Sequence, residues 1–492
     1  MRRRNGPPIA SQALLSGHRR RVTTPTSPNS PTPASTTRAV PAAAARPRLL
    51  VLAWPLFTEL LLGIAVGIVG TALAARLSDR SGAAFALANH VAGTLFILFR
   101  IVGAGVSVVV TQALGGGRRD AADAVARATL GASTWIGGVT ALAALAGARP
   151  LLQALNAPAE VMPMAVPFLM SLAPAMLLDA WNASMGSVMR AHLRSRDTLA
   201  VIVAMQACQL PLALLLMHGA GGWRGLGLPG FAVALATSRA LGLALHLLLW
   251  RARLGLVPKA SDWWRLPRRE LAAVLHIGLP GAAENIAYRL AFMVSVAVVG
   301  RMGAQAVATQ AYTQQVGMVV LLFGLATGFA VEIIVGHLVG AGHLHQAHHL
   351  VRRSLARGLA MSLAAALSAA LAGPWLLGRF THDPAIISAG TALLWWTVLL
   401  EPGRTFNLVV INALRAAGDA RFPVMAGAAS MVIVLAGGSW WLGLHLGWGL
   451  TGVWIAYAAD EWIRGLVMWR RWARQRWVPH ARATHRRLRR MA

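Results

Sequence analysis

Two residue types are almost missing from this chain of 492 residues, which has one cysteine, Cys208, and one lysine, Lys259. A single cysteine excludes an intrachain disulfide and a thiolate metal cluster. Acidic residues are also few, because 16 aspartates and glutamates stand against 46 lysines and arginines, for a formal net charge of +30. A disulfide therefore cannot stabilise the fold of this chain. The excess of positive charge needs a separate explanation.

Charged residues of either sign make up only 13% of the chain, whereas 56% is hydrophobic and the mean hydropathy is +0.57. These values are typical of a polytopic membrane protein, whose helices need about 20 apolar residues each to cross the bilayer. The sequence predicts an all-α membrane protein with twelve transmembrane helices, at roughly 49–76, 86–113, 124–147, 160–183, 197–218, 229–250, 271–300, 306–338, 350–373, 386–413, 422–446 and 449–472.

The positive charge is concentrated in the connections on one side of these spans. If both chain ends lie on that side, its connections hold 17 arginines and lysines, and those on the opposite side hold 6. The positive-inside rule then predicts that both termini are cytoplasmic. We expect anionic membrane lipids to interact with the basic residues nearest the bilayer, and we expect no nucleic-acid partner, because the tails lack interleaved aromatic residues.

The two ends of the chain are basic and polar. Residues 1–47 contain no acid and no long apolar run, which favours a disordered basic cytoplasmic tail, although an organellar transit peptide has a similar composition. Residues 478–492 form a second basic cytoplasmic tail in this interpretation.

An internal repeat organises the rest of the chain. A shift of 225 residues aligns Pro55 with Pro280, Glu59 with Glu284, Asn182 with Asn407 and Arg190 with Arg415, among other pairs. The repeat predicts an N-terminal six-helix lobe at 48–250, a cytoplasmic linker at 251–270 and a C-terminal six-helix lobe at 271–477. Because six spans return the chain to its starting side, the two bundles should be related by pseudo-two-fold symmetry along the membrane normal.

Several stretches resemble the multidrug and toxic compound extrusion (MATE) family over residues 49 to 477. They are WPLFTELLLGIAVGIVGTALAARL, ALANHVAGTLFILFRIVGAGVSVVVTQALGGGRRDAA, their second-half equivalents and the loop LRAAGDARFP. The resemblance implies twelve helices in two bundles and efflux of organic solutes driven by inward movement of protons or sodium. The segment LGWGLTGVWIAYAADEWIRGLVMWRRW also resembles a subgroup that is associated with export of flavin nucleotides. In one departure, Gly70 stands where many members carry a coupling aspartate in the first helix.

Charged residues inside predicted spans are candidates for function, since each needs an internal partner or a wet cavity. They are Glu59, Arg100, Asp179, Arg239, Glu284, Arg289, Glu332, Glu401, Arg404, Asp460, Glu461 and Arg464. Glu401 and Arg404 are three residues apart and share a helix face. They form either a structural ion pair or a site where a carboxylate exchanges an ion, and we predict the second.

The other candidates have less specific sequence signals. Glu284 and Glu59 each follow a proline by four residues, so they either stabilise a helix break or serve as protonatable groups, one per lobe. We predict ion coupling by Glu401, Glu284 and Glu59, in that order, and roles as substrate contacts or charge partners for Arg404, Arg289, Asp179 and Glu332. Arg289 could pair with Glu332 or meet an anionic substrate, and Asp179 is a candidate partner for Arg100 and Arg239. Asp460 and Arg464 should pair with each other.

No catalytic residue, cofactor or metal site is expected. The histidines of HLVGAGHLHQAHH (337–349) align with a basic first-half loop, which favours a solvated loop over a metal site.

We predict a monomeric, multi-pass antiporter of a bacterial inner (plasma) membrane that exports a small organic solute, a cationic drug or a flavin-like molecule, in exchange for H⁺ or Na⁺. The alternatives are a lipid-linked precursor flippase of the same superfamily and an intramembrane enzyme, for which the loops are short.

Overall fold

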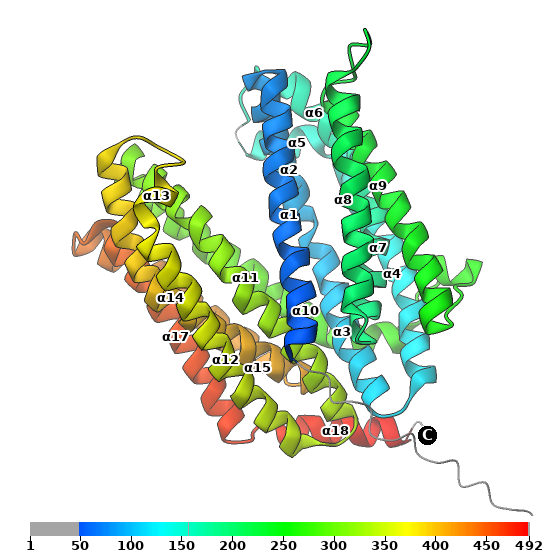
Figure 1. Ribbon diagram of the computed structural model, residues 1–492. Helices are drawn as coiled ribbons and strands as arrows, with labels where there is room; N and C mark the ends of the chain where they lie inside the picture. Colours follow the sequence, from blue (N-terminus) through cyan, green and yellow to red (C-terminus); the bar gives the residue numbers. More distant parts are fainter. Residues whose placement is uncertain (1–48, 156, 491–492) are drawn as a thin grey trace, which may run out of the picture. The chain divides into compact units, whose positions relative to one another are not determined.

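The computed structural model describes residues 49–155 and 157–490, and every regular element in that part of the chain is a helix (Figure 1). The predicted tail at 1–47 lies outside the described residues, and so do the side chains of Arg100 and of its neighbours at 97, 98 and 101.

The first half of the chain folds into nine α-helices. They are α1 (Leu49–Leu77), α2 (Asp79–Leu95), α3 (Ile97–Gly115), α4 (Arg119–Ala146), α5 (Ala148–Ala154), α6 (Met162–Ser171), α7 (Ala173–Ala191), α8 (Ser195–His218) and α9 (Leu228–Leu249). Two short helices, η1 (Trp250–Leu254) and η2 (Ala260–Trp263), lead to the second half, which begins with α10. Most of the predicted linker therefore consists of short helical turns and extended chain.

The second half contains the remaining helices. They are α10 (Arg268–Gly300), α11 (Ala304–Gly340), α12 (Leu344–Leu371), α13 (Gly373–Leu377), α14 (Pro384–Ala416), α15 (Arg421–Ser430), η3 (Met431–Gly437), α16 (Gly438–Trp440), η4 (Trp441–His445), α17 (Gly449–Ala473) and α18 (Val478–Arg490). Residues 421–445 are helical throughout, with π-helical turns at η3 and η4, and together form one apolar span.

Nine helices of the described residues are long and apolar enough to cross a membrane, and the α6–α7 pair, bent by 43°, gives a tenth. The other two predicted spans correspond to α17 and to the successive helices α2 and α3. The helix α17 carries Asp460, Glu461 and Arg464 in its middle, and α2 and α3 are separated by a break at Phe96. These interruptions explain why hydropathy and length alone identify fewer than twelve spans.

The two halves meet mainly through α3 and α1. The helix α3 packs against α10 and α11, and α1 packs against α11. A buried cluster including Leu49, Leu52 and Leu56 of α1 joins Val331 and Val335 of α11. The apolar face of one lobe is thus completed by the other, whereas the cluster around Phe85, Phe168 and Phe231 lies within the first lobe.

The repeat is visible in the positions of helix ends. The helices α3 and α11 end at Gly115 and Gly340, and α7 and α14 end at Ala191 and Ala416, in each case at residues 225 apart. We call the end of the helical bundle formed by the turns 116–118, 192–194, 341–343 and 417–420 the basic end. Gly117 and Gly342 have φ of +73° and +80°, which favours glycine at both repeat-related turns.

Residues 478–490 of the predicted basic tail (478–492) form an amphipathic helix, α18. Ala481 and Leu488 of this helix are buried, as is Trp477 just before it, and four arginines are exposed, at positions 482, 486, 487 and 489. The ring of Trp477 stacks on that of Trp472 at the end of α17, with centroids 4.2 Å apart. This stacking helps to fix the direction in which α18 leaves the second lobe.

Candidate functional site: a cavity between the lobes and a charge network in the second lobe

A cavity of about 500 Å³ lies between the lobes, with walls supplied by α1, α2, α3 and α7 of the first and by α10, α11 and α14 of the second. Such a volume suits a drug-sized solute. The wall is apolar at Leu56, Phe99, Phe329 and Ile333, and five charged side chains also line it: Glu59, Arg190, Arg289, Glu332 and Arg415.

Three of these charges belong to two repeat-related ion pairs, whose fourth member is Glu284. Glu59 Oε2 of α1 accepts from Arg190 Nη1 of α7 at 3.2 Å, and Glu284 Oε2 of α10 accepts from Arg415 Nη2 of α14 at 2.5 Å. Both members of the first pair lie 225 positions before those of the second. Each lobe therefore has one glutamate–arginine pair at the cavity, and both members line it in the first lobe, whereas only Arg415 lines it in the second.

The two pairs differ in the burial and hydrogen bonding of their carboxylate oxygens. Glu59 Oε1 is buried and has no hydrogen-bond partner among the described residues, as is also true of Glu401 Oε2 deeper in the second lobe. A buried carboxylate oxygen without a donor costs free energy when the group is charged, so it is a position where a proton or a cation is favourable.

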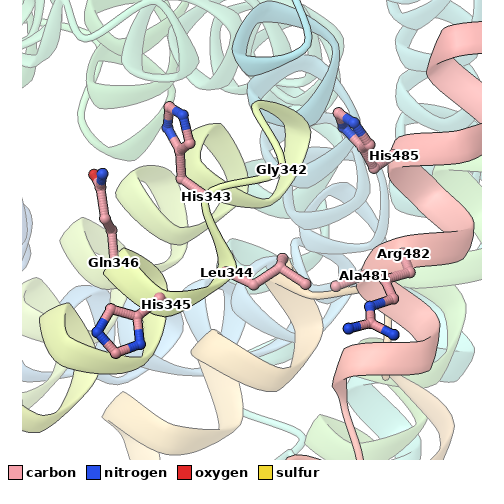
Figure 2. A pocket seen from close by; sticks show the side chains of 8 residues that line it. All are labelled: Gly342, His343, Leu344, His345, Gln346, Ala481, Arg482 and His485. Atoms are coloured by element: carbon pink, nitrogen blue, oxygen red, sulfur yellow. The ribbon is translucent and has the colours of Figure 1, made fainter.

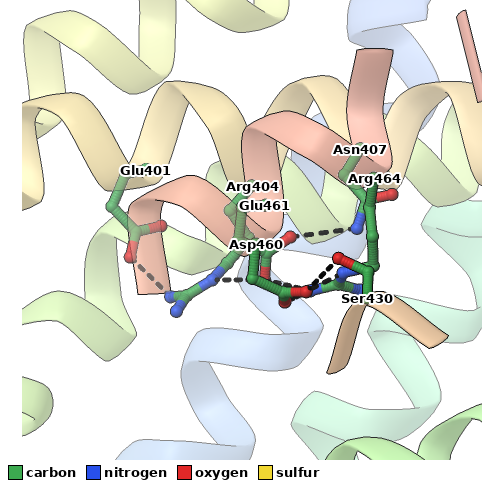
Figure 3. A network of polar contacts seen from close by, with 7 residues as sticks. All are labelled: Glu401, Arg404, Asn407, Ser430, Asp460, Glu461 and Arg464. Atoms are coloured by element: carbon green, nitrogen blue, oxygen red, sulfur yellow. Dashed lines mark hydrogen bonds and ion pairs between the residues drawn. The ribbon is translucent and has the colours of Figure 1, made fainter. Parts of the chain in front are cut away.

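A charge network lies inside the second lobe, between α14 and α17 (Figure 3). Arg404 Nη1 contacts Glu401 Oε1 at 2.5 Å and its Nε contacts Glu461 Oε1 at 3.4 Å. Arg464 Nη2 contacts Asp460 Oδ2 at 2.7 Å and Glu461 Oε1 at 2.9 Å. These five residues are called the charge network below.

Neutral donors complete the charge network. Asn407 Nδ2 donates to Glu461 Oε2 at 2.9 Å, and Ser430 Oγ donates to Asp460 Oδ1 at 2.6 Å. With three carboxylates and two guanidinium groups, the network has one negative charge more than it has positive charges when all are ionised. A buried excess charge is strongly unfavourable, so one monovalent cation would balance the network.

The charge network is close to the cavity wall. A Cβ placed on Gly427 would lie 3.8 Å from Glu284 Cγ and 3.9 Å from Arg464 Cδ, so these two side chains face the same point of α15. Glu284 pairs with Arg415, which lines the cavity, and this pair adds no net charge to the network. A charged path thus runs from the cavity to Glu401, which does not itself line the cavity.

The first lobe has a smaller, balanced counterpart. Asp179 of α7 pairs with Arg239 Nε of α9 at 2.5 Å. Gly70, at the position of the expected family aspartate, packs against aromatic rings, because a Cβ there would lie 2.9 Å from Phe85 and 3.1 Å from Phe231. An apolar wall therefore replaces a coupling carboxylate at this position.

Several contacts expected from the sequence are present. Glu401 pairs with Arg404, Asp460 with Arg464, and Asp179 with Arg239. Arg289 and Glu332 both line the cavity. The sequence interpretation missed that Arg190 and Arg415 bind Glu59 and Glu284, although the repeat aligned both glutamates and both arginines and so contained the signal.

The histidines at 337–349 are not gathered around one point. His345 and His349 form a pair with Nε2 atoms 3.0 Å apart, and His337 bonds a main-chain carbonyl. No group of three potential metal-binding residues occurs in the part of the chain that the structure describes.

Comparison with known proteins identifies relatives along nearly the whole described chain. The MatE family model matches residues 55–215 and 280–440. An uncharacterized transporter, YisQ, of Bacillus subtilis is 31% identical, with 87% of this chain and 94% of that protein covered. Multidrug resistance protein PmpM of Pseudomonas aeruginosa is 23% identical, with coverage of 82% and 83%.

A solved structure supports the same assignment at the level of fold. A crystal structure of MATE in the bent conformation matches with a TM-score of 0.80 at 18% identity, covering 89% of this chain and 96% of that chain. The predicted fold class, twelve helices in two six-helix lobes, is confirmed. The two matched segments of the family model begin and end 225 residues apart, as the repeat predicts. The chain therefore belongs to the MATE family of membrane transporters.

Proposed function

We propose that this protein is a secondary-active exporter that binds an organic solute between its lobes and exchanges it for H⁺ or Na⁺ by alternating access. The observation that carries the proposal is the charge network with one unmatched carboxylate beside a cavity that both lobes line. A carrier needs a solute site and an ion site that influence each other. The Glu284–Arg415 pair supplies that influence, because Arg415 lines the cavity and Glu284 lies near the charge network.

The proposed solute site is the cavity itself. Its apolar wall suits the body of an organic molecule, and its two glutamates and three arginines can orient polar groups of either sign. A cationic drug would meet Glu59 or Glu332, and a flavin-like molecule would meet Arg289 with its anionic part. PmpM is described as a multidrug resistance protein, which supports a drug-like solute for this chain.

The proposed ion site is in the second lobe. Glu401 and Glu284 are the carboxylates on which we expect the cation to be carried, because the charge network is negative by one, whereas the ion pairs of the first lobe are balanced. Arg404 and Arg464 then hold the remaining carboxylates in place. Glu59, with its free oxygen in the cavity wall, is the third candidate.

We propose a bacterial inner membrane as the location, with the basic end facing the cytoplasm. The turns of the basic end carry Arg118, Arg194 and His343, Arg119 begins α4 directly after the first turn, and α18 adds more arginines at its exposed face. The positive-inside rule and the negative cytoplasmic leaflet both favour this orientation.

Everted membrane vesicles test the proposal. A proton or a sodium gradient should drive uptake of a fluorescent dye or a flavin into vesicles with the wild-type chain and not into vesicles without it. Glu401→Gln should bind the solute but lose gradient-driven accumulation, because the network is then balanced without a cation. The expected loss is about 100-fold, near the upper end of typical site-to-site coupling.

A matched control is Gln310→Ala, which removes a buried hydrogen bond to Tyr457 within the second lobe and alters no charge. Normal accumulation by Glu401→Gln would show that Glu401 is structural and would move ion coupling to Glu284 and Glu59. Absence of gradient-driven uptake by the wild-type chain, for any dye, drug or flavin tested, would contradict the exporter itself.

A further inference from the structure

Two hydrogen bonds between the lobes repeat each other across the pseudo-two-fold axis. Gln112 Nε2 of α3 donates to the Ala416 carbonyl of α14 at 2.8 Å, and His337 Nε2 of α11 donates to the Ala191 carbonyl of α7 at 2.8 Å. Gln112 and His337 are 225 positions apart, and so are Ala191 and Ala416. Each lobe thus gives one side-chain donor and receives one at equivalent places.

The main chains of α3 and α11 approach each other closely at the same level. A Cβ on Gly115 would collide with the carbonyl oxygen of His337, and a Cβ on Gly340 would collide with that of Gln112. Gly115 and Gly340 are repeat mates, as are Gln112 and His337. Only glycine allows this crossing, so the two lobes are in direct main-chain contact at the basic end.

These bonds lie directly beyond the cavity. The two acceptor residues, Ala191 and Ala416, immediately follow Arg190 and Arg415, which form the ion pairs of the cavity wall. On the donor helices, Ser107 and Glu332 line the cavity about one turn before Gln112 and His337. Each arginine is therefore separated by a single peptide unit from the residue that accepts an interlobe bond.

The helix α18 lies over the same contact. His485 Nδ1 donates to the Gly340 carbonyl at 2.8 Å, and a Cβ on Gly116 would lie 3.2 Å from Leu488 Cδ1, so α18 touches the repeat-related turns of both lobes. Figure 2 shows His485 and Arg482 of α18 across from the turn at Gly342 and His343. These four residues are among those that line a cavity of about 480 Å³.

We propose that Gln112 and His337 form a two-point latch that holds the lobes together at the basic end, and that its release limits opening of the cavity toward that side. The proposal rests on the alternating access of the proposed function. Each latch bond exchanges for a bond to water when the lobes separate, so its loss favours the open form without harming the interior of either lobe.

Distances between spin labels on the two lobes measure their separation at the basic end directly in the full-length chain. Cys208→Ala supplies the background, and exposed Asp120 of α4 and Gln346 of α12 are replaced by cysteine for labelling. The double variant Gln112→Ala/His337→Ala should raise the ratio of long to short label separations by about tenfold, and each single variant by a smaller factor. Gln310→Ala, which loses one buried bond inside a lobe, should leave the ratio unchanged.

Gly340→Val tests the latch independently, through a steric clash. The valine side chain would collide with the Gln112 carbonyl when the lobes are in contact at the basic end, and would be free of it when they separate. It should also favour the long separation. An unchanged ratio in the double variant, with a wild-type melting temperature, would overturn the latch. If the double variant raises the ratio but the wild-type chain transports no solute, the proposed function is contradicted and the latch proposal is still supported.

Discussion

Arg464→Leu should greatly reduce the yield of folded protein. We expect this loss to exceed that of any other single substitution considered for the second lobe. Arg464 is 4% exposed and contacts both Asp460 and Glu461. Its removal leaves three buried carboxylates with one guanidinium group, and breaking a buried ion pair from one side costs about 3–5 kcal/mol. The yield of monodisperse protein and its melting temperature in detergent measure the loss.

The matched control is Arg289→Leu, which removes an arginine of equal size from the exposed cavity wall. It should melt close to the wild-type temperature, because the side chain is open to solvent. The double variant Asp460→Leu/Arg464→Leu should recover part of the lost stability, since both partners of one contact are then removed. A wild-type melting temperature for Arg464→Leu would show that the charge network does not stabilise the lobe.

The repeat was the most informative feature of the sequence. It predicted two equivalent six-helix lobes, and helix ends such as Gly115 and Gly340 fall at equivalent positions. Contacts between residues three or four apart, such as Glu401 with Arg404, could be predicted because a helix fixes their geometry. Hydropathy was less informative for α17, where Asp460, Glu461 and Arg464 lower its apolar character.

Contacts across the fold could not be predicted in the same way. Arg190 lies 131 residues from Glu59, and nothing in local spacing joins α1 to α7. The latch donor Gln112 bonds a main-chain carbonyl 304 residues away, and any residue type presents such a carbonyl, so the acceptor leaves no mark in the sequence. The interpretation of 478–492 as a basic tail missed the helix α18, which the spacing of Ala481 and Leu488 could have indicated.

The two lobes differ in charge at positions that the repeat makes equivalent. Asp179 corresponds to Arg404, and Arg239 corresponds to Arg464. The second lobe therefore has arginine where the first has its acid, and it compensates with Glu401, Asp460 and Glu461, whose first-lobe equivalents are apolar. The duplicated scaffold has been kept while one half acquired an excess carboxylate, which is why we assign ion coupling to the second lobe.

Glu284→Gln should reduce gradient-driven accumulation about 100-fold, whereas the repeat-related Glu59→Gln should mainly weaken solute binding. Both changes remove the carboxylate of a glutamate–arginine pair whose arginine lines the cavity, so they form a matched comparison. Only Glu284 adjoins the charge network, where loss of its charge cancels the excess that a cation would neutralise. Separate measurement of accumulation and of the half-saturating solute concentration distinguishes the two effects. Equal loss of accumulation in both variants would show that each lobe carries an ion, and loss in Glu59→Gln alone would place coupling in the first lobe.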